Sequence, residues 1–355
     1  MRILQLIDSL DAGGAERMAI NYANMLSQEH LSFICVTRTE GLLKKAMNNN
    51  VDYLFLNKKK TLDFKSIKRL NNYVKKHNIE IVHAHATSFF IATLIKFFNR
   101  KIKLIWHDHY GNSEFLKYRK FKILKLCSYK FNTIVSVNDV LKTWSENNLK
   151  CKKVSVLNNF VTISTNEVKE TVLKGQKGKR IVCLANLRQQ KNHLMLLDAF
   201  RGVYEYDKEW TLHIVGEDKA DSYSSTLKEK IGALKLHNNV FIYGSRSDVQ
   251  NILSQSDMGV LSSKSEGLPL ALLEYGLAKL PVVATNVGDC NKVVTKISEG
   301  VLVESGNYTA FGEAMLNYIN NKDLRTSCGE TLFENVTNNF SHQSIKKQLI
   351  EIYSS

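Results

Sequence analysis

Two carboxylates, Glu266 and Glu274, stand eight residues apart in the segment SEGLPLALLEYG, residues 265–276. Pro269 lies between them and fits the first turn of a helix that runs to about Lys279, because the amide hydrogen that proline lacks would be unpaired there. Glu266 would then lie in the loop before the helix, and Glu274 about one turn inside it. A carboxylate accepts two hydrogen bonds at once, which suits neighbouring hydroxyls such as the cis-diol of a ribose.

The same segment is also compatible with a purely structural role, in which one glutamate caps the helix and the other lies on the surface. Four leucines argue against this interpretation because they indicate a largely buried helix: Leu270, Leu272, Leu273 and Leu277. Buried glutamates seldom lack partners. Gly267 would let the backbone approach a ligand closely. The sequence therefore favours a binding role for this segment.

Two cations precede a second expected helix, in the stretch NLRQQKNHLMLLDAF, residues 186–200. Asn192 is a plausible N-cap, and Arg188 and Lys191 come just before it. Cations are disfavoured at this end of a helix by about 0.3–1 kcal/mol because the macrodipole is positive there. An anion between the cations and the helix would remove the conflict. A solvated turn with incidental charges is an equally compatible interpretation.

Gly13 and Gly14 lie between the first expected strand and a helix, in IDSLDAGGAERMAINYANML, residues 7–26. The stretch lacks the G-x-G-x-x-G pattern, which disfavours a Rossmann dinucleotide site. A glycine pair before a helix suits a phosphate or sugar contact, and it suits an ordinary turn equally well.

Histidines occur in two pairs at expected strand ends, His83 with His85 and His107 with His109. Such pairs can bind a metal, but no carboxylate cluster or further cysteine accompanies them, so we expect polar contacts at the mouth of a cleft. The chain has no D-x-D pair that would hold a metal and a diphosphate. It also lacks the G-x-S-x-G and G-K-[ST] motifs, which disfavours α/β-hydrolases and P-loop NTPases.

The candidate residues lie at or near the ends of expected strands and helices, and these elements repeat along the chain. Short apolar runs alternate with helical patterns of 10–15 residues, which predicts βαβ units and parallel sheets. We expect strands at 2–7, 32–37, 52–56, 79–84, 103–107, 133–137, 153–157, 180–185, 210–215, 239–244, 258–263, 281–286 and 300–305. The polar, glycine-containing stretch 162–180 breaks the rhythm and marks a boundary. The predicted fold class is therefore α/β, with two doubly wound domains, 1–165 and 166–340, facing each other across a cleft.

Composition limits the classes of protein that remain. The 355 residues exceed the size of a typical single core. The six cysteines are scattered, which argues for a reducing compartment and against a zinc site or a disulfide framework. The first residues form too short an apolar run for a signal peptide, and no segment approaches the ~20 apolar residues of a membrane span. These features predict a cytoplasmic protein, or one that contacts a membrane from the cytoplasmic side.

The net charge of +15 lies entirely in the first half of the chain. Residues 1–165 contain 27 Lys or Arg against 12 Asp or Glu, whereas residues 166–355 contain 22 of each. The basic half is expected to meet an anionic partner: nucleic acid, an anionic bilayer or a phosphorylated acceptor.

Taken together, these segments resemble the family 4 retaining glycosyltransferases of the GT-B fold over essentially the whole chain. The resemblance is carried, in family order, by GGAER, the HD after the fifth strand, RxxKN, SDMGVLSSKSEGLPLALLEYGLAKLPVVATNVGD with its E-x7-E pair, and the final helix, about 341–355. It implies transfer of a sugar from a nucleoside-diphosphate sugar, here a UDP-sugar, to a lipid-linked or glycan acceptor in cell-surface polysaccharide synthesis. It also implies retention at the anomeric carbon, no metal and no cofactor, and a final helix that packs back on the first domain.

The resemblance also assigns roles to residues of this sequence. Glu274 would hold the ribose, Glu266 would act near the transferred sugar, and Arg188 and Lys191 would neutralise the diphosphate. The remaining site residues are His107 against the sugar, Gly13 and Gly14 against the diphosphate, and Gly267, Leu268 and Pro269 against the donor. Both a same-face route and a double displacement through Glu266 stay compatible with these residues.

The sequence departs from the family pattern at three places. Lys279 stands where the family usually has glycine, Asp289 and Lys292 replace a frequent glycine and glutamate, and Asn159–Phe160 replaces Asn–Gly. Two other functions remain as alternatives. A GT-B-like nucleotide-sugar epimerase would release free sugar, and a nucleic-acid-binding protein would leave the R-x-x-K and E-x7-E segments without a role.

The stretch EFLKYRKFKILKLCSYK, residues 114–130, is rich in both cations and apolar residues. Treated as a helix, it places Leu116, Ile123 and Leu124 near one stripe, with Lys120 intruding and most cations on its flanks. An ordinary helix with a solvated face is compatible with this pattern. Because each cation near an anionic leaflet contributes about 1 kcal/mol, we instead expect peripheral attachment to the inner face of the cytoplasmic membrane.

Overall fold

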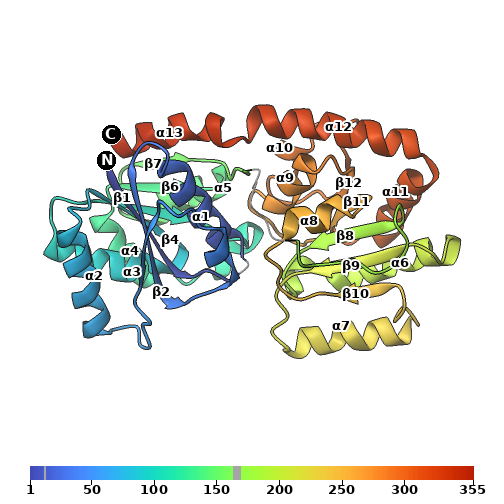
Figure 1. Cartoon of the computed structure of the whole chain (residues 1–355), viewed down its shortest axis with the longest axis horizontal. Helices are drawn as coiled ribbons and strands as arrows, with labels where there is room; N and C mark the ends of the chain where they lie inside the picture. The colour runs from blue at the N-terminus through green and yellow to red at the C-terminus, as the bar shows by residue number, and fades with distance from the viewer. Residues whose placement is uncertain (12, 163–168) are drawn as a thin grey trace. The chain divides into compact units, whose positions relative to one another are not determined.

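The computed structural model describes residues 1–11, 13–162 and 169–355, which form two compact domains (Figure 1). The N-terminal domain comprises Met1–Phe160 and His342–Ser355, and the C-terminal domain comprises Val161–Ser341. The boundary expected between residues 165 and 166 lies outside the described residues. Each domain is a parallel sheet with helices packed on it, and every apolar run expected to be a strand forms one.

The N-terminal domain is built on a seven-stranded parallel sheet in the order β3-β2-β1-β4-β5-β6-β7. Its strands are β1 (Arg2–Ser9), β2 (Leu31–Thr39), β3 (Asp52–Phe55), β4 (Ile81–His85), β5 (Lys103–Asp108), β6 (Thr133–Ser136) and β7 (Val154–Val156). The strand order reverses between β1 and β4. In sheets of this type, ligands bind beyond the carboxyl ends of the strands at such a reversal.

Helices cover both faces of this sheet. They are α1 (Gly14–Leu26), α2 (Phe64–Lys76), α3 (Phe89–Phe98), α4 (Lys122–Cys127), α5 (Asp139–Asn148) and α13 (His342–Ser354), with 3₁₀ turns η1 (Leu42–Ala46), η2 (Ala86–Ser88), η3 (Ser113–Tyr118) and η4 (Ser128–Lys130). One core lies between the sheet and α2, α3 and α4, and a second lies under α1. The apolar runs of the strands are continuous because both faces of the sheet are buried.

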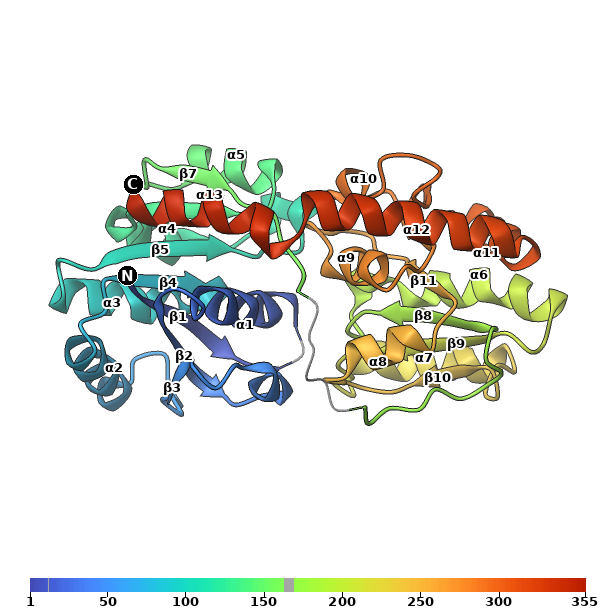
Figure 2. The same ribbon diagram turned by 45° about the horizontal axis from the view of Figure 1, so that its top comes forward.

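The last helix, α13, belongs to the N-terminal domain, and Figure 2 shows it in red lying along that domain. Lys346 on α13 forms an ion pair with Glu29 at 2.6 Å. Lys103, at the start of β5, donates to the carbonyl oxygens of Tyr353 and Ser354 at 3.1 and 3.2 Å. The helix is therefore fixed to the turn after α1 near its start and to the sheet at its end.

The expected single helix over residues 114–130 is wrong. The segment is broken into η3, α4 and η4 because Arg119, between the first two, turns inward. Its guanidinium makes two hydrogen bonds to the Asp108 carboxylate at 2.7 and 2.8 Å and lies over the rings of Tyr110 and Trp144. Arg119 is thus a buried structural cation and takes no part in the basic surface.

The C-terminal domain has a six-stranded parallel sheet in the order β10-β9-β8-β11-β12-β13. Its strands are β8 (Arg180–Leu184), β9 (Thr211–Val215), β10 (Val240–Ile242), β11 (Met258–Leu261), β12 (Val282–Thr285) and β13 (Val301–Val303). Its helices are α6 (His193–Tyr206), α7 (Ser222–Ala233), α8 (Val249–Ser254), α9 (Leu270–Leu277), α10 (Cys290–Val293), α11 (Tyr308–Asn320) and α12 (Lys322–Asn339), with a 3₁₀ turn η5 (Gln189–Lys191). The order reverses between β8 and β11.

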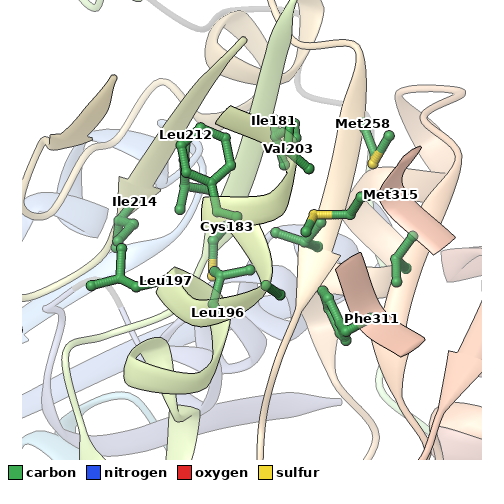
Figure 3. Close-up of a cluster of buried hydrophobic side chains, with 14 of the residues drawn as sticks. Ile181, Cys183, Leu196, Leu197, Val203, Leu212, Ile214, Met258, Phe311 and Met315 are labelled. Carbon is green, nitrogen blue, oxygen red and sulfur yellow. The ribbon is translucent and has the colours of Figure 1, made fainter. Parts of the chain in front are cut away.

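The core of this domain joins α6 and α11 to the central strands. Figure 3 shows Leu196 and Leu197 of α6 in one cluster with Cys183 of β8 and Ile214 of β9. All six cysteines of the chain are buried free thiols. Within residues 1–11, 13–162 and 169–355, we find no helix long and apolar enough to cross a membrane.

Candidate active site

Two loops meet at the reversal point of the C-terminal sheet. Strands β8 and β11 pair directly, so the loop that follows β8 and the loop that follows β11 leave the sheet side by side. The first contains Arg188 and Lys191, and the second contains Glu266. Two hydrogen bonds join the loops, from Lys264 N to Gln190 O at 2.7 Å and from Gln190 Nε2 to Ser265 O at 2.9 Å. The fold thus unites two motifs that lie about 75 residues apart in the sequence.

Lys191 and Glu266 form an ion pair at the centre of this meeting point. The Lys191 Nζ lies 2.6 Å from Glu266 Oε1, and the Ser263 hydroxyl donates to the same oxygen at 2.5 Å. Glu266 is only 5% exposed, and Ser263 is fully buried. The Ser262 hydroxyl also donates to the Lys191 carbonyl at 2.9 Å. Both the ammonium group and the carboxylate are therefore held in place by charge-assisted hydrogen bonds.

A close backbone contact supports the loop that contains Glu266 and Gly267. Gly288 has a left-handed conformation, with φ of 54°, and a Cβ added there would lie 2.2 Å from the carbonyl oxygen of Glu266. The amide of Asp289 donates to the Gly267 carbonyl at 2.9 Å. Asp289 and Lys292, which depart from the family pattern, form an ion pair with each other at 3.1 Å. Only glycine fits at position 288.

The helix α9 carries the second glutamate of the E-x7-E pair. Pro269 is the N-cap residue, and the helix ends at Leu277, two residues before the expected end at Lys279. Tyr275, which is fully buried, accepts from Leu184 N at 2.7 Å and contacts Val260 O at 3.1 Å. This side chain joins α9 to both strands of the reversal point. It thereby fixes the neighbouring Glu274, which is half-buried, while Leu268 is buried in the preceding loop.

Arg188 does not join the Lys191–Glu266 pair. Its side chain is exposed and lies 3.5 Å from Glu217. Asn192 takes the expected N-cap position of α6, but it is left-handed, with φ of 52°, and its side chain makes no capping hydrogen bond. The hydroxyl of Tyr223 instead accepts from the amide of His193 at 2.8 Å. A tyrosine from α7 therefore performs the capping role expected of Asn192.

Sequence reasoning missed Ser263 and His193 as neighbours of the charged pair. Burial, followed by the charge of Lys191, lowers the pKa of His193 to about 4, so its imidazole is neutral at pH 7. The double serine directly after the buried strand MGVL was the available signal for Ser263, because it lies at the carboxyl end of β11. His193 gave no comparable signal, since it lies inside an apolar helical pattern.

In the N-terminal domain, Gly13 and Gly14 lie at the start of α1, next to the carboxyl end of β1. Gly13 is the N-cap residue, and a Cβ added there would lie 2.2 Å from a carboxylate oxygen of Glu16. Ser9, at the end of β1, donates to Glu16 at 3.2 Å. The start of α1 is therefore covered by a carboxylate of its own first turn, which favours its positive end.

His83, His85 and His107 lie on one face of two adjacent strands, because His85 on β4 pairs in register with His107 on β5, and His109 directly follows the end of β5. His83, His85 and His107 are completely buried and His109 is half-buried. The expectation that all four line the mouth of a cleft is therefore wrong. The His107 ring stacks on His109 with 4.0 Å between centroids, and Tyr22 of α1 covers the rings of His83, His85 and His107.

These imidazoles are neutral. Burial lowers the pKa of His83 and of His109 to about 3, and it lowers the pKa values of His85 and His107 well below the ordinary range. Among the described residues, the ligand atoms of His83, His85 and His107 lie within 4.8 Å of one another, a spacing that a metal ion can bridge. Five of their six nitrogens, however, already bond to Tyr353, Gln5, His109 or each other, and only Nε2 of His107 has no partner among the described residues. The geometry therefore favours a hydrogen-bonded imidazole network.

A surface rich in apolar and basic side chains covers part of the N-terminal domain. We call it the apolar–basic surface and define it by the exposed residues Phe97, Phe98, Lys117, Tyr118, Lys120, Lys122, Ile123, Leu126, Tyr129 and Lys130. The Lys130 ammonium lies 4.9 Å from the centre of the Phe97 ring, which joins the end of α3 to η4. The stripe expected to contain both Ile123 and Leu124 is wrong in part, because Leu124 is buried in the domain whereas Ile123 is exposed.

Comparison with known families gives two matches in sequence order. Residues 12–165 match the model described as "Glycosyltransferase Family 4", and residues 164–334 match the model "Glycosyl transferases group 1". Together the two models span almost the whole chain, and their junction coincides with the polar stretch between the domains.

Individual relatives extend this similarity along the chain. A UDP-Gal:α-D-GlcNAc-diphosphoundecaprenol α-1,3-galactosyltransferase of Escherichia coli is 25% identical, with 88% of this chain and 86% of the relative covered. The amylovoran biosynthesis glycosyltransferase AmsD of Erwinia amylovora is 24% identical over 94% of each chain. The crystal structure of Anabaena HepE in complex with UDP and glucose matches all of both chains, with a TM-score of 0.81 and 17% identity.

Proposed function

The chain belongs to glycosyltransferase family 4 and has the GT-B fold, and on this basis we propose that it moves a sugar, with retention, from a UDP-sugar to a lipid-linked or glycan acceptor. The observation that carries the proposal is the Lys191–Glu266–Ser263 group at the β8/β11 reversal point. Ligands of doubly wound sheets bind at such points. The names of the E. coli and Erwinia relatives support a UDP-sugar donor and a surface-polysaccharide acceptor.

In this proposal the C-terminal domain binds the donor. Glu274 on α9 accepts hydrogen bonds from the ribose hydroxyls, and the backbone of Gly267, Leu268 and Pro269 lies against the donor. Lys191, held by Glu266, and the exposed Arg188 neutralise the diphosphate. In the N-terminal domain, Gly13 and Gly14 are proposed to contact the diphosphate.

The proposed chemistry needs positive charge most at the moment of bond cleavage. Negative charge grows on the leaving diphosphate as the bond to the anomeric carbon breaks, and fixed cations stabilise that charge electrostatically. Glu266 keeps Lys191 in position through the 2.6 Å contact and lies near the transferred sugar. Among the four histidines, His109 is the one that is not completely buried, so we propose that it contacts the sugar and that the buried His107 acts through it.

We propose that these cations act in place of a metal ion and that the enzyme needs no cofactor. Lys191→Ala should then lower kcat by at least tenfold while donor affinity falls less, because the lysine acts more strongly on the transition state than on the bound donor. Lys228→Ala, which removes a lysine paired with Asp218 on the surface of the same domain, is the matched control. Activity should survive excess EDTA. Activity that disappears on chelation and returns with Mg²⁺ or Mn²⁺ would contradict this part of the proposal.

We further propose that the apolar–basic surface attaches the protein to an anionic membrane, where a lipid-linked acceptor resides. Its exposed aromatic and aliphatic side chains can enter the interfacial region, and its lysines each contribute about 1 kcal/mol near an anionic leaflet. Membrane lipid, and no nucleic acid, is the anionic partner in this proposal, because the lysines alternate with large apolar side chains.

Liposome binding tests the membrane proposal. Binding to anionic vesicles should exceed binding to neutral vesicles, weaken with salt, and fall in the triple variant Lys117→Glu, Lys120→Glu, Lys122→Glu. The triple variant Lys68→Glu, Lys75→Glu, Lys76→Glu on the exposed side of α2 changes the charge of the same domain by the same amount. Equal loss in both variants would show that only net charge matters, and equal binding to neutral and anionic vesicles would rule out the surface as an anion-dependent anchor.

A further inference from the structure

The last helix reaches the four histidines through a single hydroxyl group. Tyr353 of α13 is buried, and its hydroxyl lies 2.7 Å from His83 Nδ1 and 3.3 Å from Gln5 Nε2. Gln5 Oε1 lies 2.8 Å from His85 Nε2. Two histidine pairs complete the network, His107 Nδ1 with His83 Nε2 at 3.2 Å and His85 Nδ1 with His109 Nε2 at 3.0 Å. The six side chains therefore form one continuous hydrogen-bonded chain.

The order of this chain is His109, His85, Gln5, Tyr353, His83, His107. Its first member is half-buried and its last is fully buried, and the two end rings stack on each other. A neutral imidazole has one donor nitrogen and one acceptor nitrogen. The direction of each hydrogen bond is therefore passed on to the next, and one orientation at the centre of the chain sets all four tautomers.

The amide of Gln5 supplies that orientation. Its NH₂ group donates to the Tyr353 oxygen, so the Tyr353 hydroxyl donates to His83 Nδ1, His83 holds its proton on Nε2, and His107 holds its own on Nε2 as well. On the other side, Gln5 Oε1 accepts from His85 Nε2–H, and His85 Nδ1 accepts from His109 Nε2–H. Reversing the Gln5 amide would reverse every bond and move all four protons to Nδ1.

We propose that Tyr353 and Gln5 are positioning residues that set the tautomer of His109 through this chain. They leave the second nitrogen of His109, Nδ1, as an acceptor for a sugar hydroxyl. The inference rests on the proposed function for the contact between His109 and the sugar, but the tautomers themselves do not depend on it. The network gives the C-terminal helix a role in the chemistry of the N-terminal domain as well as in its packing.

The buried end of the chain does not itself set the direction of the hydrogen bonds. His107 Nε2 is buried and has no hydrogen-bond partner among the described residues. In the orientation above this nitrogen is a donor without an acceptor, and in the reversed orientation it is an acceptor without a donor. Since the buried end is unsatisfied in either case, the direction follows from the orientation of the Gln5 amide, whose Nε2 faces Tyr353 and whose Oε1 faces His85.

The experiment is nitrogen NMR of protein labelled with ¹⁵N-histidine, with resonances assigned by single His→Gln changes. In the wild-type protein, His83, His85, His107 and His109 should all show the Nε2–H tautomer. Tyr353→Phe removes only the hydroxyl that holds the Gln5 amide and joins the two halves. His83 and His107 should therefore move to averaged ¹⁵N shifts, and so should His109, which is linked to Tyr353 through Gln5 and His85. Tyr22→Phe is the matched control, because its hydroxyl is equally buried beside the same rings and has no hydrogen-bond partner in the described structure.

The hydrogen-bonded network, the positioning role and the proposed function are each contradicted by a different result. Mixed tautomers in the wild-type protein, or an unchanged pattern in Tyr353→Phe, would overturn the network. For the role in the reaction, kcat/KM should fall several-fold in Tyr353→Phe and stay unchanged in Tyr22→Phe. A tautomer change with unchanged kcat/KM would overturn the positioning role while leaving the transferase function intact. Wild-type protein that transfers no sugar, yet shows the expected tautomers, would overturn the proposed function alone.

Discussion

Glu274 lies on a helix that its neighbour Tyr275 fixes to β8 and β11. If its carboxylate holds the ribose, Glu274→Ala removes charge-assisted hydrogen bonds that contribute about 1.5–3 kcal/mol each. We predict that donor affinity measured by calorimetry falls at least tenfold, with the melting temperature little changed. Glu330→Ala, an exposed glutamate of the same domain paired with Lys279, is the control. Donor binding that is the same in both variants and the wild type would remove the assignment.

Residue types and local spacing single out the charged candidate residues, but not their partners. The sequence marks Glu266 and Lys191 as candidates, and their ion pair follows only once β8 is known to lie beside β11. Similarly, each histidine pair was visible as a pattern, whereas their joint burial depends on the register of β4 and β5 and on a tyrosine about 270 residues away. Long-range pairing of this kind has no local signature.

At the scale of elements, the end of α9 shows how the chain accommodates a residue that departs from the family pattern. Lys279 is left-handed, with φ of 56°, where a glycine would be relaxed. The turn is held tightly, since a Cβ added at Gly329 of α12 would lie 2.0 Å from the Lys279 carbonyl oxygen. The lysine side chain also pairs with Glu330 at 2.8 Å and lies over the Phe333 ring, which offsets part of the backbone cost.

Two substitutions at this position separate the backbone cost from the side-chain contacts. Lys279→Gly and Lys279→Ala both remove the contacts with Glu330 and Phe333, but only glycine relieves the left-handed conformation. We therefore predict that the glycine variant is more stable than the alanine variant by about 1 kcal/mol, measured by denaturant unfolding. Equal stability of the two variants would show that the conformation at 279 carries no cost.

Strands were predicted more accurately than helices in this chain. Every expected apolar run became a strand, because buried parallel strands consist of short, continuous apolar segments bounded by polar ones. The helix expected over residues 114–130 failed at Arg119, whose inward turn depends on Asp108, Tyr110 and Trp144. An arginine in a helical pattern is expected to face solvent, and only its tertiary partners reveal that it is buried.

At the scale of the whole molecule, the neutral histidines make stability depend on pH. The pKa values of His83 and His109 are lowered to about 3 in the folded state, whereas an unfolded histidine titrates near ~6.5. Between these values the unfolded chain binds more protons, so stability falls as pH decreases from about 6.5 towards 3. Each such histidine contributes a slope of up to about 1.4 kcal/mol per pH unit.

We predict that the free energy of unfolding decreases steadily between pH 7 and pH 5, a window above the titration of most carboxylates. Calorimetric unfolding at half-unit steps measures the slope. His83→Gln should reduce the slope, whereas His237→Gln, at an exposed position, should leave it unchanged. Stability that is constant over this window, or a slope unaffected by His83→Gln, would be inconsistent with the four neutral imidazoles of this cluster.

The most direct test of the whole account is the product of the reaction. The purified protein is incubated with individual UDP-sugars and a membrane lipid extract, and the lipids and free sugars are analysed by mass spectrometry. We predict that one lipid-linked acceptor gains the mass of one sugar residue, and that the gain is lost in Lys191→Ala but retained in Lys228→Ala. An epimerised free sugar with no change in any acceptor would contradict the account and identify a nucleotide-sugar epimerase instead.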